Sequence, residues 1–266
     1  MNRLLAFIWL VPVTSFGAWT LVDDFDLYSA GALTGNGGWT ADALWTVTGA
    51  PNGGDGNVAS GLTSAANARA YKALSPSIPD TSTSATLFMR MYRSGLVNMS
   101  LGLSDDAVPA LFGGYEAQIN AQHNTAPTDS LKVRDAGAFD DLGAGTFADQ
   151  TWYNVWMVIN NSANTYQLWV DQGNFGSPTL ALTHVLDPNG GAGDFDFGFR
   201  NGAATNALGT LVMGMGGATV SGTLMVDDVY VDTAGANLTS PVPEPATGAF
   251  LILGSAAGLL RRRSGR

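Results

Sequence analysis

The sequence predicts an all-β fold, a two-sheet antiparallel jelly-roll sandwich, for the body of this 266-residue chain. Short segments in which apolar and polar residues alternate follow one another through residues 19–232, and Gly, Asn, Asp and Pro separate them. No part of this region has the periodicity of a long helix. About a dozen such strands over this length suit one domain of two packed sheets.

The first half of the body supplies strands bounded by turn residues such as Gly35-Asn36-Gly37-Gly38. Leu87, Met89 and Met91 alternate with other residues, which predicts an apolar face toward the core. The same alternation leaves Arg90 and Tyr92 on the opposite face. In order, the predicted strands are Thr20–Asp26, Trp45–Thr48, Arg69–Leu74, Ser84–Arg93, Val97–Leu103, Tyr115–Asn120 and Ser130–Arg134.

The second half contains the clearest strand pair. Trp152–Ile159 and Thr165–Asp171 are both rich in aromatic and β-branched residues, and the polar residues 160–164 between them predict a hairpin loop. Three further strands complete the prediction: Phe195–Arg200, Thr210–Met213 and Thr223–Asp232.

The composition excludes several classes of function. The chain has no cysteine, so no disulfide can stabilise it, and its core or a metal must do so. With Arg3, the four tail arginines and Glu244 set aside, seven basic and twenty-one acidic residues remain, a formal charge of −14. Such a surface repels nucleic acid and attracts divalent cations. We therefore expect no nucleic-acid partner.

The N-terminus has the three parts of a secretory signal peptide. Arg3 provides the positive charge, Leu4–Val13 is apolar, and small residues near Gly17 and Ala18 suit cleavage. Residues 1–18 are thus predicted to be a signal peptide. A buried first strand or helix is the alternative.

The C-terminus is equally distinctive. It begins with Val242-Pro243-Glu244-Pro245, where proline prevents a helix from continuing. An uncharged segment, Ala246–Leu260, then predicts a membrane helix, although it is shorter than the about 17–25 residues that span a bilayer comfortably. Arg261, Arg262 and Arg263 follow and should stay on the cytoplasmic side. The organisation is therefore 1–18 signal peptide, 19–232 sandwich domain, 233–241 spacer and 242–266 tail.

This order of motif, apolar helix and basic stop resembles the PEP-CTERM sorting signal of Gram-negative bacteria. The resemblance implies export through the inner membrane, transient anchoring there by the helix, and removal of the tail by an exosortase. The mature protein would then lie at the cell surface or in the extracellular matrix. An ordinary C-terminal anchor that stays attached is the alternative.

The body resembles the concanavalin A-like lectin/glucanase superfamily, including laminin-G-like domains. The resemblance rests on the opening segment 23–39, on the hairpin 151–171 and on the closing strand Val226–Val231. All three are signatures of the fold, and none is an active-site motif. The resemblance implies a sandwich that recognises extracellular polysaccharide or serves as a structural component of a matrix.

The carboxylates argue against catalysis. Glycosidases on this sandwich use paired Glu residues on one strand, yet the chain contains only Glu116 and Glu244. Asp105-Asp106 and Asp140-Asp141 leave an Asp–Asp mechanism open, but adjacent strand residues face opposite ways. We expect no enzyme; a secreted glycan-active hydrolase is the alternative. His123 and His184 lack the spacing of zinc ligands.

Structural calcium is the more credible site chemistry, because Ca²⁺ takes six to eight oxygen ligands. Asp24 and Asp26 on the opening strand could meet Asp227 or Asp228 on the closing strand. Strand alternation allows only one of the latter two to take part. Solvated charges that protect a sheet edge are the alternative.

Glycan binding requires exposed aromatic and polar side chains, and four residues on the predicted strands are candidates. The alternative is that they are buried, as aromatic residues on sandwich strands usually are. The candidates are Arg90, Tyr92, Trp156 and Trp169.

Overall fold

The computed structural model describes residues 18–242 except positions 52, 65, 112, 123–129, 143–145, 172–181, 202–205 and 218–220. The predicted signal peptide, apart from Ala18, and the sorting signal after Val242 lie outside these residues. In the described part of the chain, no helix is long and apolar enough to cross a membrane.

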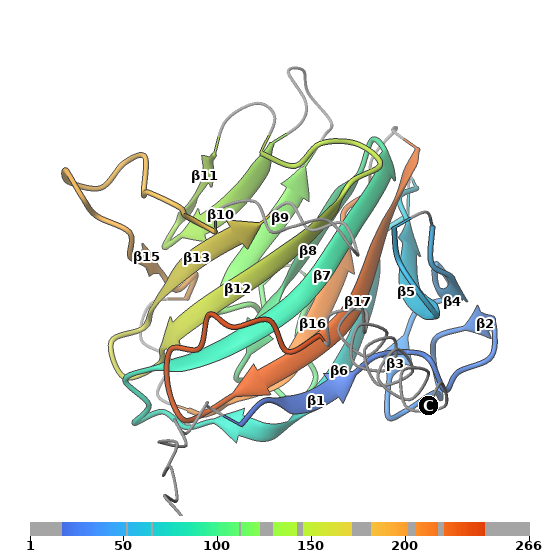
Figure 1. Cartoon of the computed structure of the whole chain (residues 1–266), viewed down its shortest axis with the longest axis horizontal. Coiled ribbons are helices and arrows are strands. Elements are labelled where there is room, and N and C mark those ends of the chain that lie inside the picture. The colour runs from blue at the N-terminus through green and yellow to red at the C-terminus, as the bar shows by residue number, and fades with distance from the viewer. Residues whose placement is uncertain are drawn as a thin grey trace, which may run out of the picture.

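Two antiparallel sheets packed face to face make up the described part of the chain, in agreement with the predicted all-β sandwich (Figure 1). The first is a ten-stranded sheet. Its strands are β1 (Thr20–Asp23), β2 (Gly31–Ala32), β4 (Trp45–Gly49), β5 (Asn57–Leu62), β7 (Ala85–Gly95), β12 (Trp152–Asn160), β13 (Thr165–Asp171), β14 (Thr183–His184), β15 (Phe197–Gly198) and β17 (Gly222–Asp232). The order is β14-β13-β12-β7-β17-β5-β4-β2, with β1 paired to β17 and β15 to β13.

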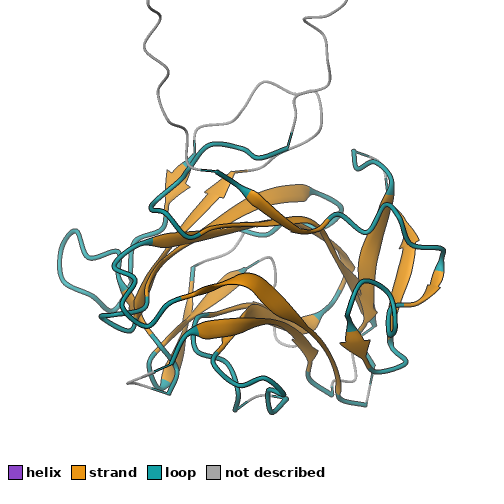
Figure 2. Cartoon of the chain, turned by 90° about the horizontal axis from the view of Figure 1, so that it is seen from below, coloured by secondary structure: helices purple, strands orange, loops and turns teal. Residues whose placement is uncertain are grey.

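The second sheet is seven-stranded in the order β11-β10-β9-β8-β16-β6-β3. Figure 2 shows that both sheets bow in the same direction, so that the outer face of the seven-stranded sheet is concave. The strands are β3 (Thr40–Ala41), β6 (Ala68–Ile78), β8 (Asn98–Ser104), β9 (Gln118–Gln122), β10 (Leu131–Asp135), β11 (Ala138–Asp141) and β16 (Leu208–Met215).

The core lies between the sheets and follows the predicted alternation. Leu87, Met89 and Met91 of β7 are fully buried in it, opposite Leu101 and Met213 of the other sheet. Because successive strand residues point to opposite faces, the same strands place polar or aromatic side chains on the outer faces. Burial of this apolar surface is the main stabilising contribution in a chain without disulfides.

The predicted hairpin is confirmed. β12 and β13 pair from Asn154 opposite Asp171 to Asn160 opposite Thr165, so the loop comprises residues 161–164. Asn164 closes the turn with φ of +57°, a conformation that asparagine tolerates better than most residues. β12 also pairs with β7, which places the hairpin beside the centre of the ten-stranded sheet.

The closing strand β17 lies at the centre of the ten-stranded sheet and changes partner along its length. Its first half pairs with β5, and its second half pairs with the opening strand β1, with Thr20 opposite Val231. The two halves meet at a β-bulge between Asp227 and Tyr230, where Asp228 has φ of +50°. The opening and closing strands therefore lie side by side, as the calcium hypothesis requires.

Residues 233–242, here called the C-terminal strap, lie against the outer face of the ten-stranded sheet. Thr86 Oγ1 donates a hydrogen bond to Gly235 O (2.9 Å), and Asn237 N donates one to Thr86 Oγ1 (2.9 Å). Farther along, Trp156 Nε1 donates to Thr239 O (3.2 Å). The segment expected to be a spacer is thus held to the domain up to Thr239.

Candidate functional site

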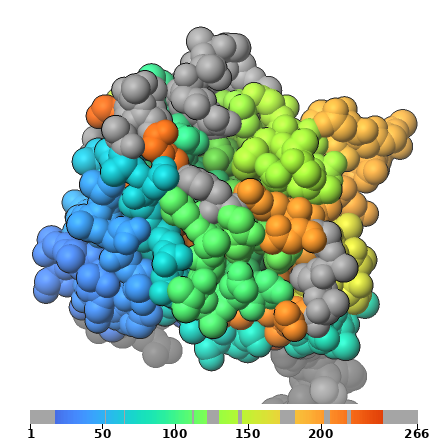
Figure 3. All heavy atoms as spheres, turned by 180° about the vertical axis from the view of Figure 1, so that it is seen from behind, coloured from blue at the N-terminus to red at the C-terminus, as the bar shows by residue number. Residues whose placement is uncertain are grey.

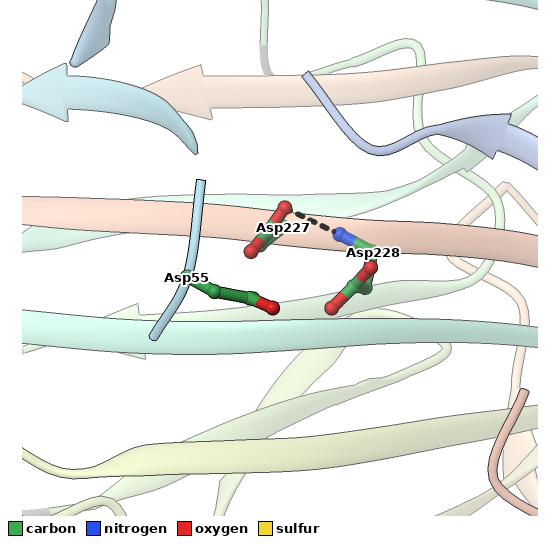
Figure 4. A group of neighbouring side chains, drawn as sticks. All are labelled: Asp55, Asp227 and Asp228. Atoms are coloured by element: carbon green, nitrogen blue, oxygen red, sulfur yellow. Dashed lines mark hydrogen bonds between the residues drawn. The ribbon is translucent and has the colours of Figure 1, made fainter. Parts of the chain in front are cut away.

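Three aspartates form a compact acidic cluster at the bulge of β17. Asp55, Asp227 and Asp228 each offer one carboxylate oxygen, and these oxygens lie within 4.8 Å of one another. Figure 4 shows the three side chains converging, with Asp55 carried by a separate segment beside the strand. We call this group the bulge cluster.

The bulge brings both neighbouring aspartates into the cluster. Asp227 is 2% exposed and Asp228 is 9% exposed; because their carboxylate oxygens lie within 4.8 Å of each other, the two side chains do not point to opposite faces of the sheet. The expectation that only one of them could take part was wrong, because the positive φ of Asp228 breaks the alternation. The backbone N–H of Asp228 donates to Asp227 Oδ1 (2.9 Å), which holds the first carboxylate over the bulge.

Asp24 and Asp26 lie beyond the end of β1, which stops at Asp23, so their predicted positions on that strand were wrong. Asp26 Oδ1 instead accepts a hydrogen bond from Asn57 N (2.9 Å), next to the turn that carries Asp55. The charges of Asp24 and Asp26 both act on Asp228. These two residues therefore surround the cluster, while Asp55 is one of its three closest members.

One basic residue faces the cluster. Arg90 Nη1 lies 3.5 Å from Asp228 Oδ2, and its Nη2 donates to Gly53 O (3.4 Å). The guanidinium also stacks over the ring of Trp152 at 4.7 Å. Three carboxylates beside one guanidinium leave excess negative charge in a largely buried place, so the cluster fits a hard divalent cation.

Burial alters the proton affinity of the cluster. It raises the pKa of Asp227 to about 9, and the negative charge of Asp228 adds to this rise. Burial also raises the pKa of Asp228 to about 6, although the positive charge of Arg90 opposes the change. Burial lowers the pKa of Arg90. Without a cation, Asp227 is therefore protonated at neutral pH, whereas Asp228 beside Arg90 is mostly ionised.

Of the four residues predicted to bind glycan, three are buried in this structure: Arg90, Tyr92 and Trp156. The C-terminal strap contacts Trp156. Trp169 is half-buried, and the ring of His184 stacks on it at 3.8 Å. Trp156 and Trp169 are paired across neighbouring strands and belong to a row of aromatic side chains on the outer face of the ten-stranded sheet. The row comprises Tyr230, Phe88, Trp156, Trp169 and His184.

The concave face of the seven-stranded sheet is polar instead. Ser100 Oγ accepts hydrogen bonds from Gln118 Nε2 and Asn120 Nδ2, both at 2.8 Å. Asn120 Oδ1 is buried and has no hydrogen-bond partner among the described residues. Lys132 of β10 lies opposite Asn120 and is half-exposed. Sequence alternation contained this signal, because these residues occupy the outward positions of β8, β9 and β10.

The segment 105–117 folds over the part of this concave face formed by β8 and β16. Tyr115 Oη donates to Ser100 O (3.4 Å), and Arg69 Nη1 contacts Pro109 O. Figure 3 shows this side of the molecule, with the green part of the chain that includes the segment in the middle. The segment carries Glu116, whose Oε1 accepts a hydrogen bond from Asn201 Nδ2 (2.8 Å).

Glu116 lies within electrostatic range of two aspartates, Asp105 and Asp106. Burial raises its pKa, the hydrogen bond from Asn201 opposes the rise, and Asp105 and Asp106 act on it only through their charge. Asp105 Oδ2 accepts a hydrogen bond from Asn206 Nδ2 (3.1 Å).

No family model and no curated protein matches the chain. Among solved structures, a sialidase is similar with 9% identity and a TM-score of 0.52, over 82% of this chain and 19% of that chain. Lectin II from Ulex europaeus matches with 8% identity and a TM-score of 0.47, over 73% of this chain and 91% of that one. The VIP36 exoplasmic/lumenal domain in its Ca²⁺/Man3GlcNAc-bound form matches with 9% identity and a TM-score of 0.41, over 76% and 86%.

The likeness to the sialidase, with a TM-score above 0.5, concerns the fold. The chain shares a two-sheet antiparallel β-sandwich with part of that protein, as the sequence predicts. Because the chain spans only about a fifth of the sialidase, and identity is low throughout, the likeness concerns the fold alone.

Proposed function

We propose that this chain is an exported module of the cell surface or extracellular matrix that binds polysaccharide without cleaving it, or supports a matrix structurally. The observation that carries the proposal is the polar outer face of the seven-stranded sheet, where Ser100, Gln118 and Asn120 (2%, 1% and 5% exposed) lie beside the half-exposed Lys132. Such groups can hydrogen-bond sugar hydroxyls, and a bowed sheet offers a long surface to an extended polymer. Lys132 is the accessible member of this polar row, and its ammonium group can donate a hydrogen bond to one of those hydroxyls.

Affinity electrophoresis through gels that contain soluble polysaccharides tests this binding. Lys132→Ala, compared with its own mobility in a gel without polysaccharide, should lose the retardation that a bound polysaccharide causes. The matched control is Asn154→Ala, which changes a half-exposed asparagine on the outer face of the opposite sheet. Equal retardation of both variants and the wild type would place binding elsewhere, and no retardation in any gel would leave only the structural role.

A glycan-active hydrolase on the same fold is the alternative. Its support is the fold shared with the sialidase and the presence of one buried carboxyl, Glu116, beside the concave face. The same polysaccharides, incubated with the protein and assayed for new reducing ends, decide between the two. Release of reducing ends that Glu116→Gln abolishes would establish the hydrolase.

The proposed route to the outside rests on the two terminal segments of the sequence. The domain is held together up to Thr239, and the motif Val242-Pro243-Glu244-Pro245 follows almost directly. An exosortase acting at this motif would release the domain from its membrane helix. Intact-mass measurement of protein from its native envelope should give an end between Pro243 and Ala246. A mass that retains Arg261–Arg266 would instead indicate a permanent anchor.

Calcium at the bulge cluster belongs to the same proposal. The bound ion would neutralise Asp55, Asp227 and Asp228 together, with Asp24 and Asp26 adding to the local negative charge. It would thereby stabilise the junction at which the opening strand meets the closing strand. Asp227→Asn should remove this binding, as measured by titration calorimetry on calcium-free protein.

A further inference from the structure

A second group of carboxylates lies at the edge of the sandwich where β14 and β11 end the two sheets. Asp135 ends β10, Asp140 lies in β11, and Asp187 follows β14 in the next loop. One carboxylate oxygen from each lies within 4.8 Å of the others. Asp140 is 4% exposed and Asp187 is 5% exposed. We call this group the edge cluster.

One carboxylate oxygen in this group has no partner. Asp140 Oδ1 accepts a hydrogen bond from Asn189 Nδ2, whereas Asp140 Oδ2 is buried and has no hydrogen-bond partner among the described residues. A buried, unpaired carboxylate oxygen is costly, because nothing replaces the water that it loses on folding. It requires a proton or a cation.

The surroundings of the edge cluster supply no basic residue. No ion pair joins Asp135, Asp140 or Asp187 to a lysine or arginine in the described part of the chain; Lys132 pairs with Asp141, 3.7 Å away. Burial raises the pKa of Asp140; the negative charges of Asp135 and Asp187 add to the rise, as does a hydrogen bond that a protonated Asp140 shares with Asp187, while the hydrogen bond from Asn189 opposes it. The bulge cluster differs in this respect, since Arg90 lies against it.

The chain positions these carboxylates firmly. Asp135 Oδ1 accepts a hydrogen bond from Gly198 N (2.7 Å), which ties β10 to β15 of the other sheet. Asp187 Oδ1 accepts from Asn189 N (2.8 Å), and Asp187 N donates to Asp194 O (3.0 Å), closing the loop on itself. Gly190 is required here, because a Cβ at this position would lie 2.7 Å from Asp187 Oδ2.

We propose that the edge cluster binds a calcium ion through Asp135, Asp140 and Asp187, with the unpartnered oxygen of Asp140 as a ligand. The donors are all oxygens, which selects a hard cation. Calcium–oxygen distances of about 2.3–2.6 Å allow ligands on opposite sides of the ion to lie about 5 Å apart, which accommodates the observed spacing. Backbone carbonyls and water complete the coordination.

The ion links the two sheets. Asp135 and Asp140 come from the seven-stranded sheet, and Asp187 comes from the loop that connects β14 with β15 of the ten-stranded sheet. Calcium therefore fastens the open edge of the sandwich, a role that disulfides fill in many exported domains and that this chain, without cysteine, must fill otherwise. This inference does not depend on glycan binding or on the bulge cluster.

Calorimetric titration of the calcium-free full chain with Ca²⁺ tests the proposal. Asp140→Asn should bind one calcium ion fewer than the wild type, or should bind that ion with a Kd at least tenfold higher. The matched control is Asp141→Asn, which changes the next, exposed residue on the other face of β11 and should bind as the wild type does. At a calcium concentration about 100 times the Kd, the melting temperature of the wild type should rise by about 5–10 °C through this site.

Two results would overturn the proposal. One is an Asp140→Asn variant with the same number of calcium equivalents and the same melting shift as the wild type. The other is an Asp140→Asn protein that fails to fold in calcium-free buffer, because removal of an unpaired buried charge should not destabilise it. Asp187→Asn provides a second variant with the same expected loss, while Asp227→Asn should remove only the binding at the bulge cluster.

Discussion

Asp227→Asn should stabilise the calcium-free protein at pH 8 and make its stability less dependent on pH. The folded carboxyl of Asp227 has a pKa of about 9, against an ordinary value of 3.8, because it is buried beside Asp228. Between these two pH values the folded chain holds one proton that the unfolded chain has released. The free energy of unfolding therefore falls as the pH rises, and this stability is fully present only below about pH 3.8.

The size of this effect follows from the slope of the unfolding free energy against pH. One extra proton in the folded state corresponds to about 1.4 kcal/mol per pH unit, so the wild type should lose about 4 kcal/mol between pH 5 and pH 8 through this group. Asparagine has no proton to release and can still accept the hydrogen bond from Asp228 N. The advantage of Asp227→Asn over the wild type should therefore be about 4 kcal/mol larger at pH 8 than at pH 5.

Urea unfolding in the presence of a chelator, at both pH values, measures this difference. Asp80→Asn is the control, because Asp80 is exposed and its replacement should change the free energy of unfolding by less than about 0.5 kcal/mol. The argument from burial would be refuted if Asp227→Asn were less stable than the wild type at pH 8. It would also be refuted if the difference in unfolding free energy between variant and wild type were the same at both pH values.

Three further predictions concern the fold. Leu101→Ala, in the core between the sheets, should cost about 2–5 kcal/mol in urea unfolding, whereas Leu27→Ala, at a side chain that is 94% exposed, should cost almost nothing. Gly56→Ala should destabilise the protein and weaken calcium binding in calorimetry, because φ is +60° there and the new methyl group would overlap an aspartate carboxylate of the opening loop; unchanged binding would contradict this. Asn237→Ala should loosen the C-terminal strap and increase acrylamide quenching of the tryptophan fluorescence, since it removes the bond from Asn237 Nδ2 to Asp232 Oδ2 of β17 (2.8 Å), while the backbone bond from Asn237 N to Thr86 Oγ1 remains; unchanged quenching would contradict this.

Strands with strong alternation were predictable from local sequence. β7, β12 and β13 carry aromatic and β-branched residues in a regular pattern, and the structure places them side by side. The short β5 was not predicted, because Asn57–Leu62 contains small residues whose strand conformation comes from pairing with the preceding strand β4 and with β17, which is distant in sequence. Tertiary pairing, rather than intrinsic propensity, decides such a segment.

The candidate sites were predictable only in part. The meeting of the opening and closing strands follows from the resemblance to lectin-like sandwiches, and it brings Asp227 and Asp228 near the opening segment. Their shared orientation depends on a bulge, for which the sequence contains no glycine signal. Asp55 lies in a glycine-rich turn that resembles any other turn, and only the folded chain brings it to the cluster.

Only one member of the edge cluster, Asp140, was noticeable in the sequence. Asp140-Asp141 stands out as an acidic pair, and the structure confirms that the two residues face opposite ways, one buried and one exposed. Its partners, Asp135 and Asp187, are separated by more than fifty residues along the chain. They meet because β10 and the loop after β14 lie at the same open edge of the sandwich, which no local pattern encodes.

The central claim is that divalent cations neutralise the buried carboxylates of this cysteine-free sandwich. The most direct test is the number of calcium ions that the folded chain binds, measured by equilibrium dialysis at pH 8 together with the melting temperature. Two equivalents per chain, with a marked fall in melting temperature after chelation, are predicted. A chain that binds no calcium and melts at the same temperature with or without chelator would contradict the account.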